Sequence, residues 1–233
     1  MSHEVSVHEA QTAILRELLF LPEASFSSLR KTVNFDSDHF KFHIKRLVEL
    51  GYIVKNQDGN YSLTAKGKEY ANKLDTDQGV IERQPKSAVI IVLQKDDDEV
   101  LVQERLKHPF YGYIGYPGGK IRWGETIIEA AARELLEETN LEANFTYRGI
   151  YHEHIKSEET GELLEDKIFH IVNGKLVGGE LIKQFEGGKN SWISLAALKK
   201  VDKKYLSCDI ETQIGTGEES FVEKTQVYNQ DEF

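Results

Sequence analysis

The chain has 233 residues, with 29 lysines and arginines against 39 aspartates and glutamates, so its formal net charge at pH 7 is −10. This length can bury one large core or two small ones. The single cysteine, Cys208, cannot form an internal disulfide and is typical of a reducing compartment. No apolar run approaches the roughly 20 residues that span a bilayer, and the N-terminus has no signal-peptide profile. We therefore expect a soluble cytoplasmic protein.

Residues 1–75 are predicted to form a small α+β domain. Helical periodicity at 10–20 and a short segment at 27–33 precede a helix that Asp36 or Ser37 caps and that carries apolar residues at helical spacing, Phe40, Ile44, Leu47 and Val48. Gly51 is expected to end this helix in the left-handed conformation. Two alternating segments, 52–55 and 61–64, flank an Asp-Gly turn typical of a hairpin, and a last helix carries Tyr70, Ala71 and Leu74.

This order of elements resembles a winged helix-turn-helix domain, in which the helix at 37–50 would be the recognition helix. Its open face is then expected to present the candidate DNA contacts His39, Lys41, Phe42, His43, Lys45 and Arg46. Asp36 and Asp38 would oppose phosphate, and an exposed Phe42 could instead mark a contact in a homodimer, which is the oligomer we expect. DNA binding and protein interaction both stay open, because a fold does not fix a function.

Beyond a polar linker at 76–86, the sequence predicts a second, α/β domain at 87–205. Its strand candidates lie at 88–93, 100–102, 145–154, 167–172 and 191–194, with a helix at 127–138. The polar tail at 206–233 receives no structural prediction.

Three carboxylates of that helix are the main chemical signal. Glu134 lies three and four residues from Glu137 and Glu138, so the three share a helix face. An apolar stripe is expected on the opposite side, at Ile128, Ala131, Ala132 and Leu135. Only Arg133 is near enough to pair with these acids, so a solvated face is a poor explanation. Crowded carboxylates suit a hard divalent cation.

The surrounding spacing resembles the Nudix box. Gly119 is followed six residues later by Glu125 and then by the run from Arg133 to Leu141, RELLEETNL, while Tyr116-Pro117-Gly118 precede it. The family's closing glycine is Asn140 here, the next most tolerant residue for a left-handed helix end. The resemblance implies a Nudix α/β/α sandwich with a mixed sheet.

The resemblance also implies a hydrolase that uses Mg²⁺ or Mn²⁺ to cleave the pyrophosphate of a nucleoside diphosphate linked to another group. It gives Glu134, Glu137, Glu138 and the Gly118 carbonyl as metal ligands, with Gly119 and Glu125 structural in the box. Arg133 would either orient a catalytic carboxylate or form a structural ion pair. The general base is open among Glu137, Glu138 and Glu186, and for Glu186 the role of an ordinary loop carboxylate is slightly favoured.

Substrate specificity stays open. Tyr113, Tyr116 and Trp123 could stack on a nucleobase or belong to the core. His152 and His154 alternate on a predicted strand and share a face, but the sequence shows no further ligands for a zinc site.

Two functions therefore compete: a Mg²⁺-dependent pyrophosphatase, and a DNA-binding transcriptional regulator whose Nudix domain senses a nucleotide such as ADP-ribose. The presence of all three glutamates favours the enzyme. The net charge does not exclude DNA binding by the first domain, because residues 1–75 are neutral, with 10 basic and 10 acidic residues.

Overall fold

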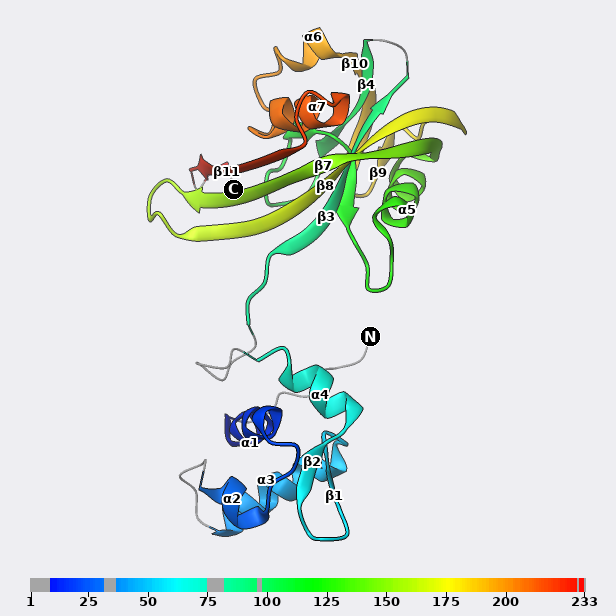
Figure 1. Cartoon of the computed structure of the whole chain (residues 1–233). Coiled ribbons are helices and arrows are strands. Elements are labelled where there is room, and N and C mark those ends of the chain that lie inside the picture. The colour runs from blue at the N-terminus through cyan, green and yellow to red at the C-terminus, as the bar shows by residue number, and fades with distance from the viewer. Residues whose placement is uncertain (1–8, 32–36, 75–81, 96–97, 230, 233) are drawn as a thin grey trace. The chain divides into compact units, whose positions relative to one another are not determined.

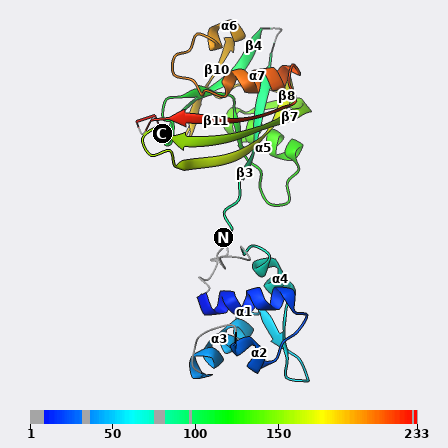
Figure 2. The same ribbon diagram turned by 60° about the vertical axis from the view of Figure 1, so that its left-hand side comes forward.

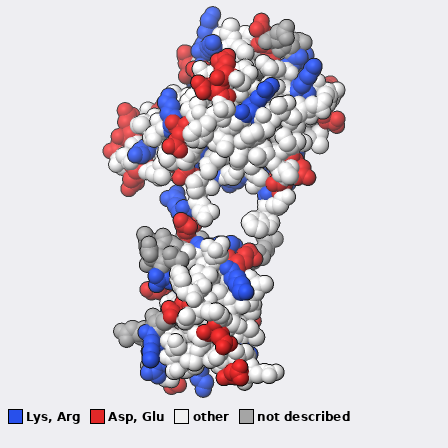
Figure 3. All heavy atoms as spheres, in the orientation of Figure 1, with Lys and Arg blue, Asp and Glu red and all other residues white. Residues whose placement is uncertain are grey.

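The structure, a computed structural model, describes residues 9–31, 37–74, 82–95, 98–229 and 231–232. The chain forms two compact units, Met1–Arg83 and Gln84–Phe233. Among the described helices, none is long and apolar enough to cross a membrane. Lysines and arginines are interspersed with aspartates and glutamates over the face of each unit that Figure 3 shows.

The first unit consists of helices around a two-stranded hairpin (Figure 1). In chain order its elements are α1 (Glu9–Phe20), α2 (Phe26–Arg30), α3 (Ser37–Glu49), β1 (Ile53–Lys55), β2 (Tyr61–Leu63) and α4 (Ala65–Ala71). Gly51 ends α3 with a φ of 73°, and Gly59 turns the hairpin with a φ of 84°, as the sequence predicts. The proposed cap Asp36 lies outside the described residues, as do the last two positions of the segment at 27–33.

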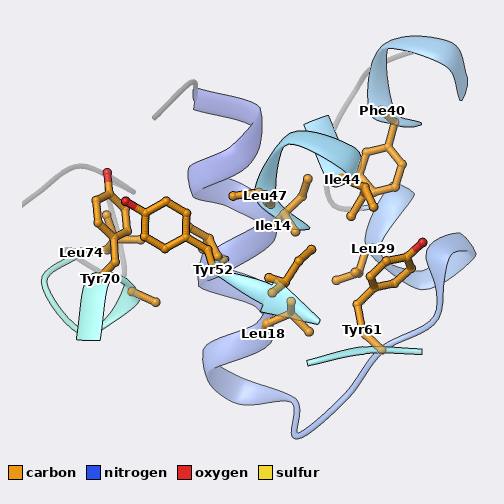
Figure 4. Close-up of a cluster of buried hydrophobic side chains, with 14 residues drawn as sticks. Ile14, Leu18, Leu29, Phe40, Ile44, Leu47, Tyr52, Tyr61, Tyr70 and Leu74 are labelled. Carbon is orange, nitrogen blue, oxygen red and sulfur yellow. The ribbon is translucent and has the colours of Figure 1, made fainter. Parts of the chain in front are cut away.

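The core of this unit is drawn in Figure 4. Ile14 and Leu18 of α1 share this core with side chains of the other helices and of the hairpin region. These are Leu29, Phe40, Ile44, Leu47, Tyr52, Tyr61 and Tyr70. The apolar periodicity of the sequence is thus used in one shared core.

Helix α3 is rotated slightly from the orientation predicted. His43, expected on the open face, is buried with 7% of its surface exposed, whereas Val48, expected in the core, is exposed. The buried positions Phe40, His43, Ile44 and Leu47 follow i, i+3, i+4 and i+7 spacing, which centres the stripe one residue earlier. His43 therefore leaves the set of candidate DNA contacts.

The second unit is built on one mixed sheet. Its strands are β3 (Lys86–Gln94), β4 (Glu99–Arg105), β5 (Ile114–Gly115), β6 (Gly118–Lys120), β7 (Leu141–Ser157), β8 (Leu163–Gly179), β9 (Gln184–Phe185), β10 (Gly188–Ser194) and β11 (Phe221–Tyr228). The order across the sheet is β11-β7-β8-β3-β4-β10-β9, with β5 on β4 and β6 on β3. The β3–β8 and β7–β11 pairs are parallel, and the other pairs are antiparallel.

Helices cover both faces of this sheet, which matches the predicted α/β/α layering (Figures 1 and 2). Helix α5 (Ile127–Thr139) packs on one face, where Val89, Ile91 and Leu93 of β3 meet it. Helix α7 (Cys208–Thr216) packs on the other, where Ile214 joins a cluster that contains Val92. A short helix, α6 (Leu195–Leu198), follows β10.

The polar tail that received no prediction is part of this unit. It contains α7 and β11, and β11 pairs in parallel with β7 from Phe221 opposite Ile150 to Tyr228 opposite Ser157. Only Gln226 and Tyr228 of β11 are buried, so the strand lacks the alternation of apolar and polar residues that predicts a β-strand from sequence.

Candidate active site

Helix α5 is fixed at both ends. At its start, the Thr126 side chain accepts a hydrogen bond from the Glu129 amide (3.3 Å), while the Glu129 carboxylate accepts one from the Thr126 amide (2.8 Å). At its end, Asn140 has a φ of 57°, the left-handed conformation that we predict, and its side chain donates to the Glu180 carbonyl (3.1 Å). The carboxylates between these caps therefore have defined positions.

The buried stripe of α5 differs from the prediction. Ala130, Ala131, Leu135 and Thr139 are buried, whereas Ile128 and Ala132, which we expected in the stripe, are exposed. Because the stripe is rotated, Glu134 and Glu138 lie beside the buried face rather than opposite it. Both carboxylates are therefore half-buried, next to the part of the helix that packs on the sheet.

Two of the three carboxylates line a cavity of about 670 Å³. Glu134 and Glu138 belong to its walls, and the pKa of Glu138 is raised by burial and by the nearby charge of Glu134. Gln103 acts against this rise by donating a hydrogen bond to Glu138 (3.0 Å). Glu137 is different: half of its side chain, 49%, is exposed, and Arg122 contacts it at 3.2 Å. Two of the three acids therefore face the cavity, whereas Glu137 is not among the described residues that line it.

Arg133 connects the helix to the loop before it. Its guanidinium donates to both carboxylate oxygens of Glu125, at 2.5 and 2.8 Å, and also to Glu134 (2.6 Å) and to the Lys120 carbonyl (3.1 Å). The side-chain hydrogen bond from Arg133 is the main reason that the pKa of Glu125 falls to about 2. The bidentate geometry sets the direction of both partners.

Gly118 and Gly119 occupy positions at which a side chain would clash with neighbouring atoms. A Cβ on Gly119 would overlap the carboxyl group of Glu134, and a Cβ on Gly118 would overlap the Val89 carbonyl on the neighbouring strand. Gly118 pairs with Ile90 at the start of β6 and lines the cavity. Because neither glycine has a side chain, its backbone can lie close to the Glu134 carboxylate or to strand β3.

The cavity also contains basic and acidic groups that sequence reasoning missed. Its lysines and its arginine are Lys86, Arg105, Lys107, Lys120 and Lys167, and further acids come from β7, β8 and α7, namely Glu153, Glu165 and Glu211. Burial raises the pKa of Glu211 to about 8, and it also raises the pKa of Glu153. These residues lie far apart in the sequence and carry no spacing signal, so only the sheet topology brings them together.

Asn190 and Gln103, which the sequence did not indicate, support the C-terminal end of α5. Asn190 of β10 donates to the main-chain carbonyl of Glu138 and to that of Ile182, each at 2.8 Å. Its side-chain oxygen lies 3.3 Å from the Gln103 amide that also reaches Glu138. Asn190 and Gln103 thus hold the backbone and the carboxylate of one residue.

The predicted aromatic contacts are dispersed. Tyr116 lines the cavity but is otherwise buried, and its hydroxyl lies 2.7 Å from the Thr212 hydroxyl. Tyr113 packs in an aromatic cluster with Phe110, Tyr205 and Tyr228 and does not itself line the cavity. Trp123 is 98% exposed. Of the three, the structure brings only Tyr116 to the cavity.

Glu186, the candidate base, is exposed in the turn between β9 and β10. Among the described residues that line the cavity, the carboxylates are Glu134, Glu138, Glu153, Glu165 and Glu211. Glu186 is therefore outside the cavity in this conformation.

The comparison with protein families decides the identity of the second unit. A family model described as NUDIX domain matches residues 84–208, just over half of the chain. The chain belongs to the Nudix family. A model described as Domain of unknown function (DUF7347) matches residues 3–74.

A curated relative and two solved structures agree with this membership. The chain is 29% identical over 131 residues to the ADP-ribose pyrophosphatase of Methanocaldococcus jannaschii, an alignment that covers 54% of this chain and 77% of the relative. The MutT protein of Bacillus halodurans aligns with a TM-score of 0.50 at 22% identity, covering 64% of this chain and 93% of the other. A Nudix hydrolase from Nitrosomonas europaea gives the same TM-score and identity, covering 59% and 93%. Both structures share the Nudix fold.

Nudix hydrolases generally use divalent metal ions, and the donors here fit one. Glu134 and Glu138 bring carboxylate oxygens into one cavity, and the missing side chain of Gly119 leaves the room that the Glu134 carboxylate fills. An all-oxygen donor set of this kind suits a hard cation. Family membership and the curated relative support a hydrolase that acts on pyrophosphate bonds.

Proposed function

We propose that the protein is a Mg²⁺-dependent hydrolase that cleaves the pyrophosphate of a nucleoside diphosphate linked to another group. The observation that carries this proposal is the cavity itself, in which Glu134 and Glu138 face the same space as Arg105, Lys107 and Lys120. Carboxylates that hold a cation and basic side chains that meet phosphate oxygens are what a diphosphate ester requires. ADP-ribose is the first substrate to test, because the curated relative is an ADP-ribose pyrophosphatase.

Glu134 and Glu138 would hold the metal, with the Gly118 carbonyl and Glu137 as further donors. When bound, the ion neutralises diphosphate charge and lowers the pKa of an attacking water. The chain's own contribution is to position these groups. Arg133 keeps one oxygen of Glu134 in place at 2.6 Å, and Gln103 orients Glu138 at 3.0 Å.

Glu137 is the candidate for accepting the proton of the attacking water. Half of its side chain is exposed to solvent, and Arg122 and Arg133 lie 3.2 and 3.4 Å from its Oε2. These two arginines would direct the carboxylate toward the loop.

The test is a screen of nucleoside diphosphate derivatives, beginning with ADP-ribose, for Mg²⁺-dependent turnover. Glu134→Gln, Glu137→Gln and Glu138→Gln should each reduce turnover by at least a hundredfold with the fold retained, whereas Glu142→Gln, on an exposed residue just past the helix, should not. Normal turnover in the Glu134 and Glu138 variants would refute the metal assignment. Absence of turnover for every compound in the wild type would refute the enzyme.

For the first unit we propose a winged helix-turn-helix module that binds DNA through α3. In support, α3 exposes Lys41, Lys45 and Arg46, and Phe42 beside them is 62% exposed. An isolated β-bridge also pairs Ala24 with Tyr61 of the hairpin. Glu49 opposes the proposal, because it lies within 3.7 Å of both Lys45 and Arg46 and reduces their free charge.

The test is binding of the full chain to its own upstream DNA at several salt concentrations. Lys41→Ala and Lys45→Ala should weaken binding and lower its salt dependence, and addition of ADP-ribose should alter it if the units are coupled. Lys73→Ala, just past the end of α4 and outside the proposed contact, is the matched control. Absence of a shift at low salt, combined with a change of oligomeric state in Phe42→Ala, would make α3 a dimer contact instead.

A further inference from the structure

A second group of potential ligands lies outside the cavity, on the sheet face opposite Glu153. His152 and His154 come from β7, Asp166 from β8 and Glu223 from β11. The register places Asp166 directly opposite His154 and Glu223 directly opposite His152. Side chains paired in this way on adjacent strands point to the same face. Three strands therefore contribute to one cluster.

The two imidazoles converge on one carboxylate. His152 Nε2 lies 2.9 Å from Asp166 Oδ1, and His154 Nε2 lies 3.7 Å from Asp166 Oδ2. The ligand atoms of these three residues all lie within 4.8 Å of one another. In a tetrahedral site with zinc bonds of about 2.0–2.1 Å, neighbouring ligand atoms are separated by about 3.3 Å. Small side-chain adjustments would close the present spacing to that value.

Glu223 completes the arrangement from the other side of the ring. Its carboxylate lies 2.8 Å from Nδ1 of His152. A hydrogen bond from Nδ1 to a carboxylate leaves Nε2 as the lone-pair nitrogen, which is the usual support of a metal-binding histidine. All four side chains are partly exposed, so an ion could enter from solvent.

We propose that His152, His154 and Asp166 form a site for a first-row transition metal such as Zn²⁺, with Glu223 orienting His152 and solvent completing the coordination. The site is separate from the carboxylates of α5. Its nitrogen and oxygen donors suit Zn²⁺, whereas the all-oxygen set of the cavity suits Mg²⁺. The proposal does not depend on the hydrolase activity.

The alternative is a simple ion pair in which a charged His152 bridges Asp166 and Glu223. Such a pair has no need of His154, whose nearest contact with Asp166 is the longer one. A metal site, in contrast, needs both imidazoles and the carboxylate. Removal of His154 therefore separates the two explanations.

The experiment is calorimetric titration of Zn²⁺ into untagged, chelator-treated full-length protein that contains excess Mg²⁺ to occupy the cavity. We expect one Zn²⁺ per chain. His154→Ala and Asp166→Asn should each weaken binding by at least tenfold, and Glu223→Gln by on the order of tenfold. Zn²⁺ should also raise the thermal midpoint of the wild type, and it should raise that of His154→Ala by less at the same Zn²⁺ concentration.

Two controls make the result specific. His170→Gln removes another histidine from β8 and should bind Zn²⁺ as the wild type does. Glu134→Gln alters the cavity and should also retain binding. Loss of binding in Glu134→Gln, or wild-type affinity in His154→Ala with circular dichroism showing an intact fold, would overturn the proposal, as would a wild type that takes up no Zn²⁺.

Discussion

The guanidinium of Arg133 holds both carboxylate oxygens of Glu125, eight residues earlier in the chain, at 2.5 and 2.8 Å. The same group also reaches Glu134 and the Lys120 carbonyl. One side chain thus joins the loop that precedes α5 to a proposed ligand on the helix. It acts on the position of other groups, and it is not itself among the described residues that line the cavity.

Arg133→Lys should reduce turnover of the substrate found in the screen by roughly a hundredfold, because a lysine ammonium cannot make the bidentate contact and misplaces the loop. In the double variant with Glu125→Gln, the losses in turnover should be far from additive, because both substitutions break the same Arg133–Glu125 contact. Steady-state kinetics of the single and double variants measures this, with exposed Arg148→Lys as the control. Additive losses would show that the two residues act independently.

Gly119→Ala should lower the apparent affinity for Mg²⁺ by at least tenfold, because the added methyl group overlaps the Glu134 carboxylate and displaces it. The measurement is turnover as a function of Mg²⁺ concentration. Gly178→Ala is the matched control, since no described atom lies within 4 Å of the position of its Cβ. An unchanged Mg²⁺ dependence in Gly119→Ala would show that Glu134 is not a ligand.

Glu211→Gln should stabilise the protein above neutral pH. Burial raises the pKa of Glu211 from 4.5 to about 8, so between these values the folded state keeps a proton that the unfolded state has lost. Stability of the wild type therefore falls as pH rises through this range, and the neutral glutamine avoids that loss. Urea unfolding should show the variant more stable by on the order of 2 kcal/mol at pH 8 and nearly equal at pH 5.

The control is Glu180→Gln, which changes an exposed glutamate of the same unit. It should leave the pH dependence of unfolding as in the wild type. A difference between Glu211→Gln and the wild type that stayed constant from pH 5 to pH 8 would contradict the assignment.

Gly149→Ala should release the start of β11. A Cβ at this position of β7 would overlap the carbonyl of Ser220, which accepts a hydrogen bond from the Ile150 amide at 3.0 Å. We expect a loss of about 2 kcal/mol in the free energy of unfolding. Amide exchange at 221–228 should accelerate, whereas Gly178→Ala should leave it unchanged. Protection of β11 equal to that of the wild type would mean that the backbone accommodates the methyl group.

The sequence predicts those parts of the fold whose signal is local. Helix α5 and its proposed ligands follow from spacing within a run of residues, and Gly51 and Asn140 end their helices where their backbone preferences indicate. The rotation of α3 that buries His43 was not predictable, because apolar spacing fixes a helix face only to within about one residue.

The missed residues depend on tertiary contacts. Glu211 reaches the cavity only because α7 packs on the sheet, and Asp166 meets His154 only through the register of two long strands. Strand β11 was missed for a related reason: its buried Gln226 is polar and donates to the Tyr151 hydroxyl at 3.3 Å, so hydropathy does not mark it. Such pairings come from topology, which the linear pattern does not contain.

The parallel pairing of β11 with β7 has a kinetic consequence. Val222 lies opposite Tyr151, so closing this edge requires the chain to bring together segments that are remote in sequence. Non-local pairings of this kind slow folding, because the entropy of loop closure is lost before the contacts form. Until β11 is in place, β7 is an open edge that another chain could pair with. We therefore expect docking of β11 to be the slow step in refolding and the interval of greatest aggregation risk.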